Sequence, residues 1–152
     1  MRHEKLKVVA APPPEQAGYV LAEQVGFLMR VAQQRHTAIF TAHMIEGLTQ
    51  PQFAALAKLD EVGPCSQNHL GRLIFLDAAT IKGVIDRLSA RGFVSAVSDP
   101  TDRRRRALAL TERGRAITEA AIKVAAEITA ATLTPLTAGE QGQVTRLLKK
   151  LG

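Results

Sequence analysis

The stretch of sequence that decides the fold is residues 66–93, SQNHLGRLIFLDAATIKGVIDRLSARGF. Ser66 and Asp77 are of the residue types that cap helix N-termini, and apolar residues follow each of them at helical spacing. The sequence therefore predicts a short helix over 67–75 and a second helix over 78–91, with Gly92 as the C-terminal stop. Two short helices joined by so few residues form a helix-turn-helix.

A β-hairpin is predicted immediately after the second helix. Residues 93–97 are typical of a strand, 99–102 (DPTD) of a turn, and 105–110 of a returning strand with alternating side chains. Strand alternation would send Arg103 and Arg105 to one face and Arg104 and Arg106 to the other. A helix-turn-helix followed by a hairpin predicts a winged helix.

Helical segments flank this centre on both sides. Apolar residues recur at threes and fours from 15 to about 45, Thr49 opens a helix, Thr111 caps a helix over 112–132, and Pro135 precedes a last helix over 138–150. The apolar face of the helix after Thr49 is expected to consist of Phe53, Leu56, Ala57 and Leu59. Residues 1–14, which contain PPP at 12–14, are expected to form a flexible arm.

The predicted fold class is mainly α with a small β-hairpin wing, a winged helix-turn-helix between N- and C-terminal dimerisation helices. Residues 15–152 are expected to form a single domain, a normal size for a chain of 152 residues. Within it, about 48–110 form the winged-helix lobe, and about 15–46 and 112–151 form the flanking helices.

Composition and charge exclude several classes of protein. No apolar run reaches about 18 residues, so a membrane-spanning helix is not expected, and a single cysteine, Cys65, allows no internal disulfide and fits a reducing compartment. No metalloprotease, P-loop, dinucleotide-binding or nucleophile-elbow motif is present, so we expect neither an enzyme nor a cofactor.

Residues 66–115 carry ten Lys and Arg against five Asp and Glu, which accounts for most of the net charge of +6. A local basic field of this kind suits a polyanion.

Several segments resemble the multiple-antibiotic-resistance regulator (MarR) family. They are LTQPQF at 48–53, SQNHLGR at 66–72, DAAT at 77–80, VIDRL at 84–88, RGFV at 91–94, DPTDRR at 99–104 and LTERG at 110–114. Each is weak alone, but the ordered set covers about 16–150. The resemblance implies a cytoplasmic, homodimeric transcription regulator, often a repressor, which a small ligand or an oxidant commonly releases from double-stranded DNA.

The second helix of the motif carries the predicted base contacts. A recognition helix offers its N-terminal turns to base edges in the major groove; Thr80 can bond with a base edge or a phosphate, and Lys82 with guanine or phosphate. Gly83 costs about 1 kcal/mol against alanine in a helix, which indicates close packing or close approach to DNA. The predicted DNA-binding residues of the motif are Ser66, Gln67, Ala79, Thr80, Lys82, Gly83 and Arg87.

Arginines further along this helix and in the wing have other expected roles. For Arg87 and Arg91 we expect a phosphate contact or an ion pair with Asp86. Four consecutive arginines over 103–106 repel one another, and phosphates relieve that repulsion. The resemblance matches Asp102 and Arg104 to the family's Asp-x-Arg wing motif, which implies that Arg104 supports the wing through ion pairs or enters the minor groove. Arg103 is the alternative tip residue.

The first helix carries the predicted ligand site. His36, Phe40 and His43 fall on one helical stripe, and Arg30 lies nearby in sequence. In the family, effector pockets lie between the first helix and the DNA-binding lobe, and residues 27–40 resemble members that respond to aromatic carboxylates or their coenzyme A thioesters. Apolar walls with Arg or His suit such an acid. The alternative is that both histidines belong to a half-buried dimer core.

Other functions stay open at this point. Cys65 and His69 lie one helical turn apart and could form half a zinc site with His36 or His43; Cys65 could also be a redox switch. A winged helix that binds a protein rather than DNA is the third possibility. No bound metal is predicted.

An apolar stripe on the flanking helices predicts a dimer. Helices of this length are too apolar to be covered by so small a lobe, and obligate interfaces resemble a domain core cut in half. The stripe consists of Ala120, Ala121, Val124, Ala125, Ile128, Leu133, Leu147, Leu148 and Leu151.

Overall fold

The computed structural model describes residues 9–11 and 18–152, in two compact units, 1–35 and 36–152. The first unit contains the 3-10 helix η2 (Leu21–Glu23) and the first part of α1 (Val25–His43). The helix predicted to begin at residue 15 therefore begins at Val25. Most of the predicted arm over 1–14, and residues 15–17, lie outside the described residues.

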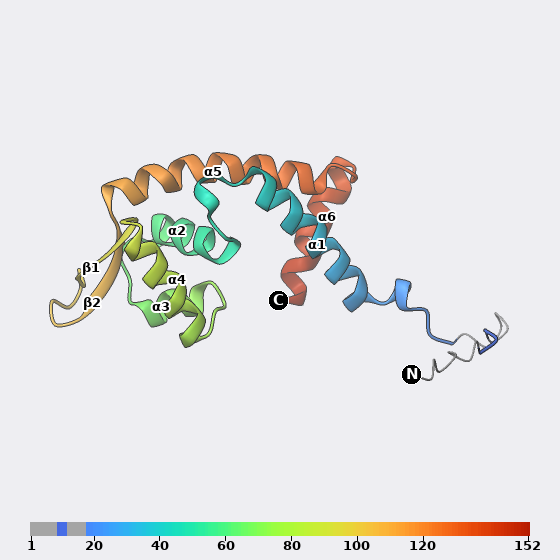
Figure 1. Ribbon diagram of the computed structural model, residues 1–152, viewed down its shortest axis with the longest axis horizontal. Helices are drawn as coiled ribbons and strands as arrows, with labels where there is room; N and C mark the ends of the chain where they lie inside the picture. The colour runs from blue at the N-terminus through green and yellow to red at the C-terminus, as the bar shows by residue number, and fades with distance from the viewer. Residues whose placement is uncertain (1–8, 12–17) are drawn as a thin grey trace, which may run out of the picture. The chain divides into compact units, whose positions relative to one another are not determined.

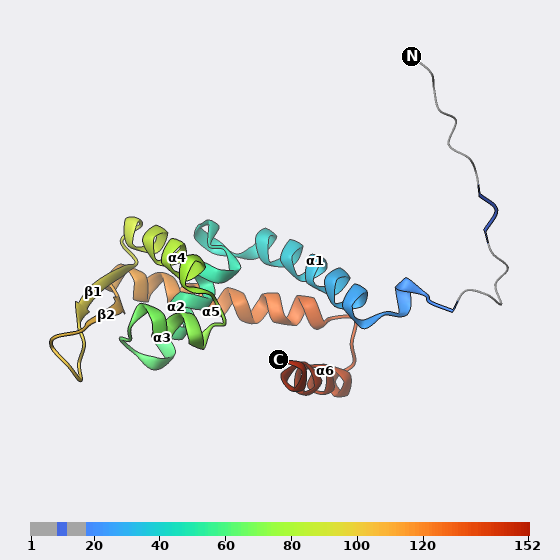
Figure 2. The same cartoon turned by 90° about the horizontal axis from the view of Figure 1, so that it is seen from below.

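The second unit is a winged helix followed by two helices (Figure 1). After the end of α1 come η3 (Ile45–Gly47), α2 (Gln50–Val62), α3 (Gln67–Leu73), α4 (Ala78–Ala90), β1 (Val94–Ser98), β2 (Arg106–Leu110), α5 (Glu112–Leu133) and α6 (Ala138–Leu151). The two views agree that the hairpin lies beside α4 at the beginning of α5 (Figures 1 and 2). The predicted fold class, mainly helical with a small hairpin wing, is confirmed.

Side-chain caps explain where the helices of this unit begin. An oxygen of each N-cap residue accepts a hydrogen bond from a backbone N–H in the first turn, which satisfies a donor that the helix itself leaves unpaired. The caps are Thr49 for α2, Ser66 for α3, Asp77 for α4, Thr111 for α5 and Thr137 for α6. At Thr49 the bond is reciprocal, because Gln52 Oε1 accepts from Thr49 N at 3.1 Å.

The core lies where α2, α3 and α4 meet the wing and α5. Its largest fully buried side chains include Phe93, Leu56, Leu70, Ile81 and Leu88. The residues predicted to face inward from α4, namely Ile81, Val84, Ile85 and Leu88, are all buried. On α2 the prediction was partly wrong, because Ala55 is fully buried and Ala57 only half-buried.

The hairpin is antiparallel, with Val94 opposite Leu110 and Ser98 opposite Arg106. Each strand begins one residue later than predicted. Cys65, in the loop before α3, also pairs with Leu108: Leu108 N donates to Cys65 O at 2.7 Å, and Cys65 N donates to Leu108 O at 3.2 Å. This bridge ties the beginning of the helix-turn-helix to the wing.

Two glycines allow the chain to close around Phe93. Gly92 has a φ of 77°, the left-handed conformation that glycine adopts without cost. Gly114, in the first turn of α5, packs directly on Phe93, since a Cβ at Gly114 would lie 1.9 Å from the Phe93 carbonyl oxygen. The wing is therefore held against both α4 and α5.

The apolar stripe predicted for a partner is partly covered by the chain itself. Ala121 and Ile128 of α5 are buried within the second unit, whereas Leu147, Leu148 and Leu151 of α6 are exposed. In the first unit, Val25, Leu28 and Met29 are also exposed. Over the described residues, no helix is long and apolar enough to cross a bilayer.

Candidate nucleic-acid interface and ligand cavity

The outer face of α4, formed by the exposed residues Ala78, Ala79, Thr80, Lys82, Asp86 and Arg87, is turned away from the core. Asp77 Oδ1 accepts from Thr80 N at 2.8 Å, which fixes the first turn of the helix. This hydrogen bond from the Thr80 backbone lowers the pKa of the Asp77 carboxyl, so the carboxyl is charged at neutral pH. The first turn thus presents small side chains and one hydroxyl on a capped, preformed helix.

The charged residues of α4 pair differently from the prediction. Lys82 Nζ lies 2.6 Å from Asp86 Oδ2, so Asp86 pairs with Lys82 rather than with Arg87 or Arg91. The pair lies one helical turn apart and both side chains are mostly exposed, so it costs little to open. Arg91 instead donates to the carbonyl of Glu46 at 2.7 Å and lies 3.4 Å from its carboxylate.

Gly83 has room for a side chain inside the chain. A Cβ there would meet only the Arg87 guanidinium, at an ordinary 3.5 Å. The prediction of close packing within the chain is therefore wrong for Gly83, which is half-buried, and close approach to DNA stays a prediction.

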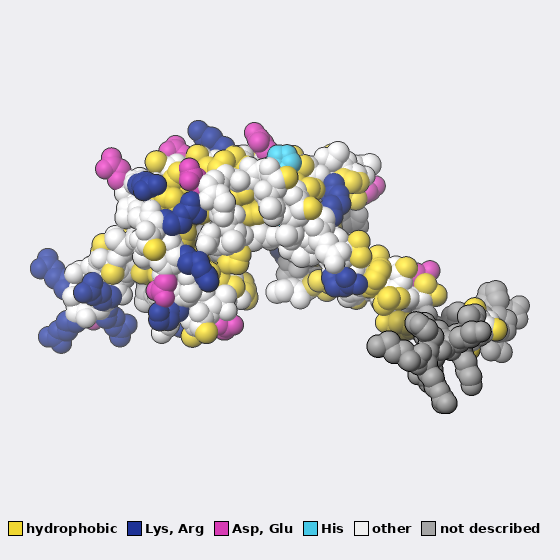
Figure 3. All heavy atoms as spheres, in the orientation of Figure 1, with side chains coloured by type: hydrophobic (Ala, Val, Ile, Leu, Met, Phe, Trp, Pro, Cys, Tyr) yellow, Lys and Arg dark blue, Asp and Glu magenta, His cyan; other side chains and the backbone are white. Residues whose placement is uncertain are grey.

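The wing tip, Arg103–Arg106, is a concentrated cationic surface (Figure 3). All four side chains are exposed, but the predicted strand alternation is wrong for three of them, because β2 begins only at Arg106. Arg103, Arg104 and Arg105 belong to the turn. They can therefore spread around the tip instead of dividing between two faces.

Two aspartates shape this turn. Asp99 Oδ1 accepts from both the hydroxyl and the backbone N–H of Thr101, at 2.7 and 2.8 Å, and these bonds lower the pKa of the Asp99 carboxyl. Asp102 Oδ1 accepts from Arg104 N at 3.0 Å, and Asp102 Oδ2 lies 3.8 Å from Arg105 Nε. The ion pair of Asp102 is thus with Arg105, and Arg104 forms no ion pair within the described residues, so of its two implied roles the entry into a minor groove stays a prediction.

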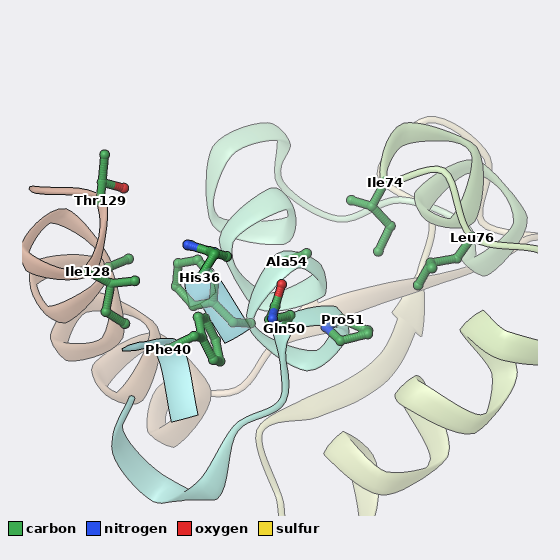
Figure 4. A pocket seen from close by; sticks show the side chains of 11 residues that line it. His36, Phe40, Gln50, Pro51, Ala54, Ile74, Leu76, Ile128 and Thr129 are labelled. Atoms are coloured by element: carbon green, nitrogen blue, oxygen red, sulfur yellow. The ribbon is translucent and has the colours of Figure 1, made fainter. Parts of the chain in front are cut away.

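A cavity of about 380 Å³ lies within the second unit, between the end of α1, α2, α5 and the turn of the helix-turn-helix. Figure 4 shows His36 and Phe40 from α1 near Ile128 of α5, with Ile74 and Leu76 across the space. The lining residues are His36, Phe40, Gln50, Pro51, Phe53, Ala54, Ile74, Leu76, Ala125, Ile128 and Thr129. The walls are mainly apolar with a few polar groups, as in small-molecule sites.

Comparison with known proteins supports the resemblance of the sequence. The sequence profile of the MarR family matches residues 48–105, from just before α2 to the wing tip. The transcriptional repressor NicR of Pseudomonas putida is 41% identical over 93% of this chain and 90% of its own length. The chain belongs to the MarR family of transcriptional regulators.

Solved structures of this family agree with the fold. A probable transcriptional regulator from Pseudomonas aeruginosa is 47% identical and superposes with a TM-score of 0.83, over 88% of this chain and all of its own. BpsR of Bordetella bronchiseptica, whose DNA binding is regulated by 6-hydroxynicotinic acid, is 40% identical with a TM-score of 0.81, over 88% of this chain and 96% of its own. The MarR-family chain is thus a winged-helix regulator of transcription.

The other predicted DNA-contact residues lie at the start of α3. Ser66 Oγ accepts from His69 N at 3.2 Å, so the Ser66 oxygen is engaged as the helix cap, and both Ser66 and Gln67 are half-buried. Ser66 lines a groove of about 730 Å³ that reaches Arg105 and Arg106 of the wing. Ser66 is thereby placed beside the wing tip.

The described part of the chain offers little for a metal or redox sensor. Across residues 9–11 and 18–152, no three His, Cys, Asp or Glu side chains gather into a metal-binding group. Burial raises the pKa of the Cys65 thiol, which disfavours the reactive thiolate. Cys65 and His69 line the same groove, but the structure gives them no further ligand.

The four predicted ligand-binding residues lie in three different places. His36 and Phe40 line the cavity. His43 is exposed and its Nδ1 lies 2.8 Å from the carbonyl of Ile39 on its own helix. Arg30 belongs to the first unit, where its guanidinium lies 5.3 Å from the centroid of the Phe27 ring.

The cavity residues that other helices contribute, among them Gln50 and Thr129, were not predicted, and neither was the hydrogen bond between His36 and Thr132. His36 and Thr132 are 96 positions apart, and a single sequence carries no local signal for such a pairing.

Proposed function

We propose that this MarR-family chain is a repressor that binds a pseudo-palindromic operator as a homodimer and leaves it when a small aromatic carboxylate enters the His36 cavity. The observation that carries the DNA-binding part is the pairing of two exposed surfaces on one rigid lobe. The outer face of α4 and the cationic wing tip both belong to the lobe that the buried core around Phe93 holds together.

The outer face of α4 supplies the base contacts in this proposal. Thr80 bonds with a base edge, and Lys82 exchanges Asp86 for guanine or a phosphate. Ala79 and Gly83 allow the helix backbone to lie close to the bases. Arg87, one turn further along, contacts a phosphate.

The wing supplies contacts to the DNA backbone. Arg103 and Arg104 make no ion pair within the described residues, so they are available for phosphates or a narrow minor groove. Asp102 supports them from within the turn, by accepting from Arg104 N. Ser66 and Gln67 contact the DNA from the start of α3 in this proposal.

The dimer is proposed from exposed apolar surface. Leu147 and Leu151 of α6 are 43% and 68% exposed, and Val25 of α1 is 65% exposed. Side chains of this kind are covered in obligate dimers. We assign 48–110 to the DNA-binding lobe and 15–46 with 112–151 to the dimer. A two-fold axis places the half-sites about one helical turn apart.

Release follows from the position of the cavity. Leu76 lines the cavity and directly precedes Asp77, the cap of α4. A ligand packed between Leu76 and the His36–Phe40 pair would therefore bias the orientation of α4. A tenfold loss of operator affinity needs only about 1.4 kcal/mol of coupling.

The class of ligand rests on the cavity and on one relative. Apolar walls with His36, Gln50 and Thr129 suit an aromatic ring with polar substituents. BpsR responds to 6-hydroxynicotinic acid, an aromatic carboxylate. We extend that class, including coenzyme A thioesters of such acids, to this chain.

The test begins with selection of bound fragments from the source genome, followed by fluorescence anisotropy on the selected operator. Lys82→Ala and Thr80→Ala should change the relative affinities among operator variants by about 1–3 kcal/mol. The matched control is Lys58→Ala, which removes a similar helical ion pair, Lys58 with Glu61 at 2.8 Å, on α2. Unchanged base preferences in both α4 variants would contradict the assignment of α4, and a stable monomer at micromolar concentration in sedimentation would contradict the dimer.

A further inference from the structure

A short chain of hydrogen bonds connects His36 to the backbone of α5. His36 Nδ1 lies 2.9 Å from Thr132 Oγ1, and Thr132 Oγ1 donates to the carbonyl of Ile128 at 2.9 Å. A carbonyl oxygen can only accept, so the single proton of the Thr132 hydroxyl points toward Ile128. Thr132 Oγ1 therefore accepts from His36, and His36 Nδ1 carries the proton.

This arrangement fixes the chemical character of the other ring nitrogen. A neutral imidazole has one N–H donor and one bare acceptor nitrogen. With the proton held on Nδ1 by Thr132, the acceptor is Nε2. No described residue forms a hydrogen bond with Nε2, and the His36 ring lines the cavity next to Phe40, with ring centroids 6.4 Å apart.

We infer that His36 is a specificity-determining residue that selects an aromatic acid bearing a hydrogen-bond donor, a ring hydroxyl or a ring N–H, and binds this donor at Nε2. This inference rests on the proposed function and deepens it. The acid group itself is held away from His36, since a lone pair on Nε2 repels a carboxylate.

The environment of His36 supports Nε2 as the acceptor. Its neighbours from α1, α2 and α5 in the cavity are uncharged, namely Phe40, Gln50, Ile128 and Thr129, and none of the lining residues is Asp, Glu, Lys or Arg. No carboxylate is therefore present in the lining to hold a proton on Nε2. Ligands that leave Nε2 unpaired lose a hydrogen bond that water had supplied, which corresponds to about a tenfold loss of affinity in a partly open site.

The first experiment is calorimetric titration of the full chain with two matched pairs of acids. One pair is 6-hydroxynicotinic and nicotinic acid, and the other is 4-hydroxybenzoic and 4-methoxybenzoic acid. The parent should bind the donor-bearing member of each pair about tenfold more tightly or better. In His36→Phe this preference should disappear.

Variants of the hydroxyl relay separate positioning from general damage. Thr132→Val removes the acceptor that holds the Nδ1 proton, so the preference should fall, and Thr132→Ser should restore it. The matched control is Thr134→Val, because Thr134 makes the same kind of bond, from Oγ1 to the carbonyl of Ala130 at 2.8 Å, on an exposed part of α5. That control should keep the preference of the parent.

A spectroscopic measurement reads the tautomer without a ligand. In ¹⁵N spectra of the imidazoles above the histidine titration, with His36 assigned by the signals lost in His36→Phe, Nδ1 should be protonated and Nε2 bare. Thr132→Val should shift this toward the other tautomer.

The outcomes distinguish this inference from the proposed function. If the acids bind and release operator DNA but both members of each pair bind equally, or if His36 carries its proton on Nε2, the selectivity inference is wrong and the proposed function stands. If no acid in either pair binds, the proposed ligand class fails and the inference fails with it.

Discussion

Replacing one arginine of the wing tip should change how DNA binding depends on salt. In Arg103→Ala or Arg104→Ala, each subunit loses one exposed cation that forms no ion pair within the described residues. Each phosphate contact contributes about 0.9 to the slope of log K against log salt on duplex DNA, so a dimer that loses two contacts should show a slope smaller in magnitude by about 1.8. Between 50 and 200 mM salt, the ratio of the parent's DNA affinity to the variant's should then fall about twelvefold.

The assay is fluorescence anisotropy on operator and unrelated duplexes at four or more salt concentrations. Both duplexes should show the same change in slope, because phosphate contacts carry no sequence information. Arg105→Ala serves as an internal comparison: Arg105 already faces Asp102 at 3.8 Å, so a smaller change is expected. A slope equal to that of the parent in both Arg103→Ala and Arg104→Ala would show that the wing does not contact the DNA.

Three further predictions concern the scaffold that positions these surfaces. Gly114→Ala places a Cβ 1.9 Å from the Phe93 carbonyl oxygen, so thermal unfolding should show a loss of about 3 kcal/mol in the free energy of unfolding. A variant as stable as the parent would contradict the packing of α5 on the wing. Phe75 is 90% exposed with a φ of 58°, and Phe75→Asn should stabilise the lobe by about 1 kcal/mol because asparagine tolerates this conformation; an unchanged melting temperature would show that Phe75 is held by contacts. Asp77→Ala should destabilise the chain at neutral pH, because the Thr80 hydrogen bond lowers the pKa of the Asp77 carboxyl in the folded state. This stabilisation is complete above the unfolded pKa and is lost as the pH falls through the lower folded pKa, so the melting temperatures of parent and variant should converge in acid. A difference in melting temperature that stays constant with pH would show that the charge of Asp77 does not contribute to the cap.

The helix starts of the lobe could be predicted from the sequence because they are local. Ser66, Asp77 and Thr111 cap the helices for which they were predicted, and each acts on a backbone N–H three residues later. A cap and the apolar spacing behind it lie within one segment of the chain, so no knowledge of the fold is needed.

Two kinds of interaction could not be predicted. In one, several side chains could pair with the same residue, and in the other, the two partners lie far apart in the sequence. Asp86 had cationic neighbours on both sides along α4, and only the geometry shows that it pairs with Lys82. Arg91 pairs with Glu46, which lies 45 positions away in a turn with an unusual φ of 56°. The pairing of Arg91 with Glu46 depends on where the fold brings the end of α4 and η3, and the sequence holds no local trace of it.

The wing and the cavity were also predicted only in part. The hairpin was predicted, but the alternation of Arg103–Arg106 was wrong, because the returning strand begins only at Arg106 and a turn has no two-residue period. His36 and Phe40 could be placed on one stripe of α1, but their cavity is completed by α2, α5 and Leu76. The composition of a site built from four elements cannot be predicted from one of them.

The central claim is that the His36 cavity controls DNA binding by the α4 and wing surfaces. It is tested most directly by titrating 6-hydroxynicotinic acid into the complex of the full chain with its selected operator, for the parent and for His36→Phe, with anisotropy as the readout. The account predicts that the acid raises the operator dissociation constant of the parent about tenfold or more, and that His36→Phe binds the operator without ligand but responds much more weakly. Equal release of the parent and His36→Phe would place the effector elsewhere, and no release by this acid, the benzoates or their thioesters would contradict the account.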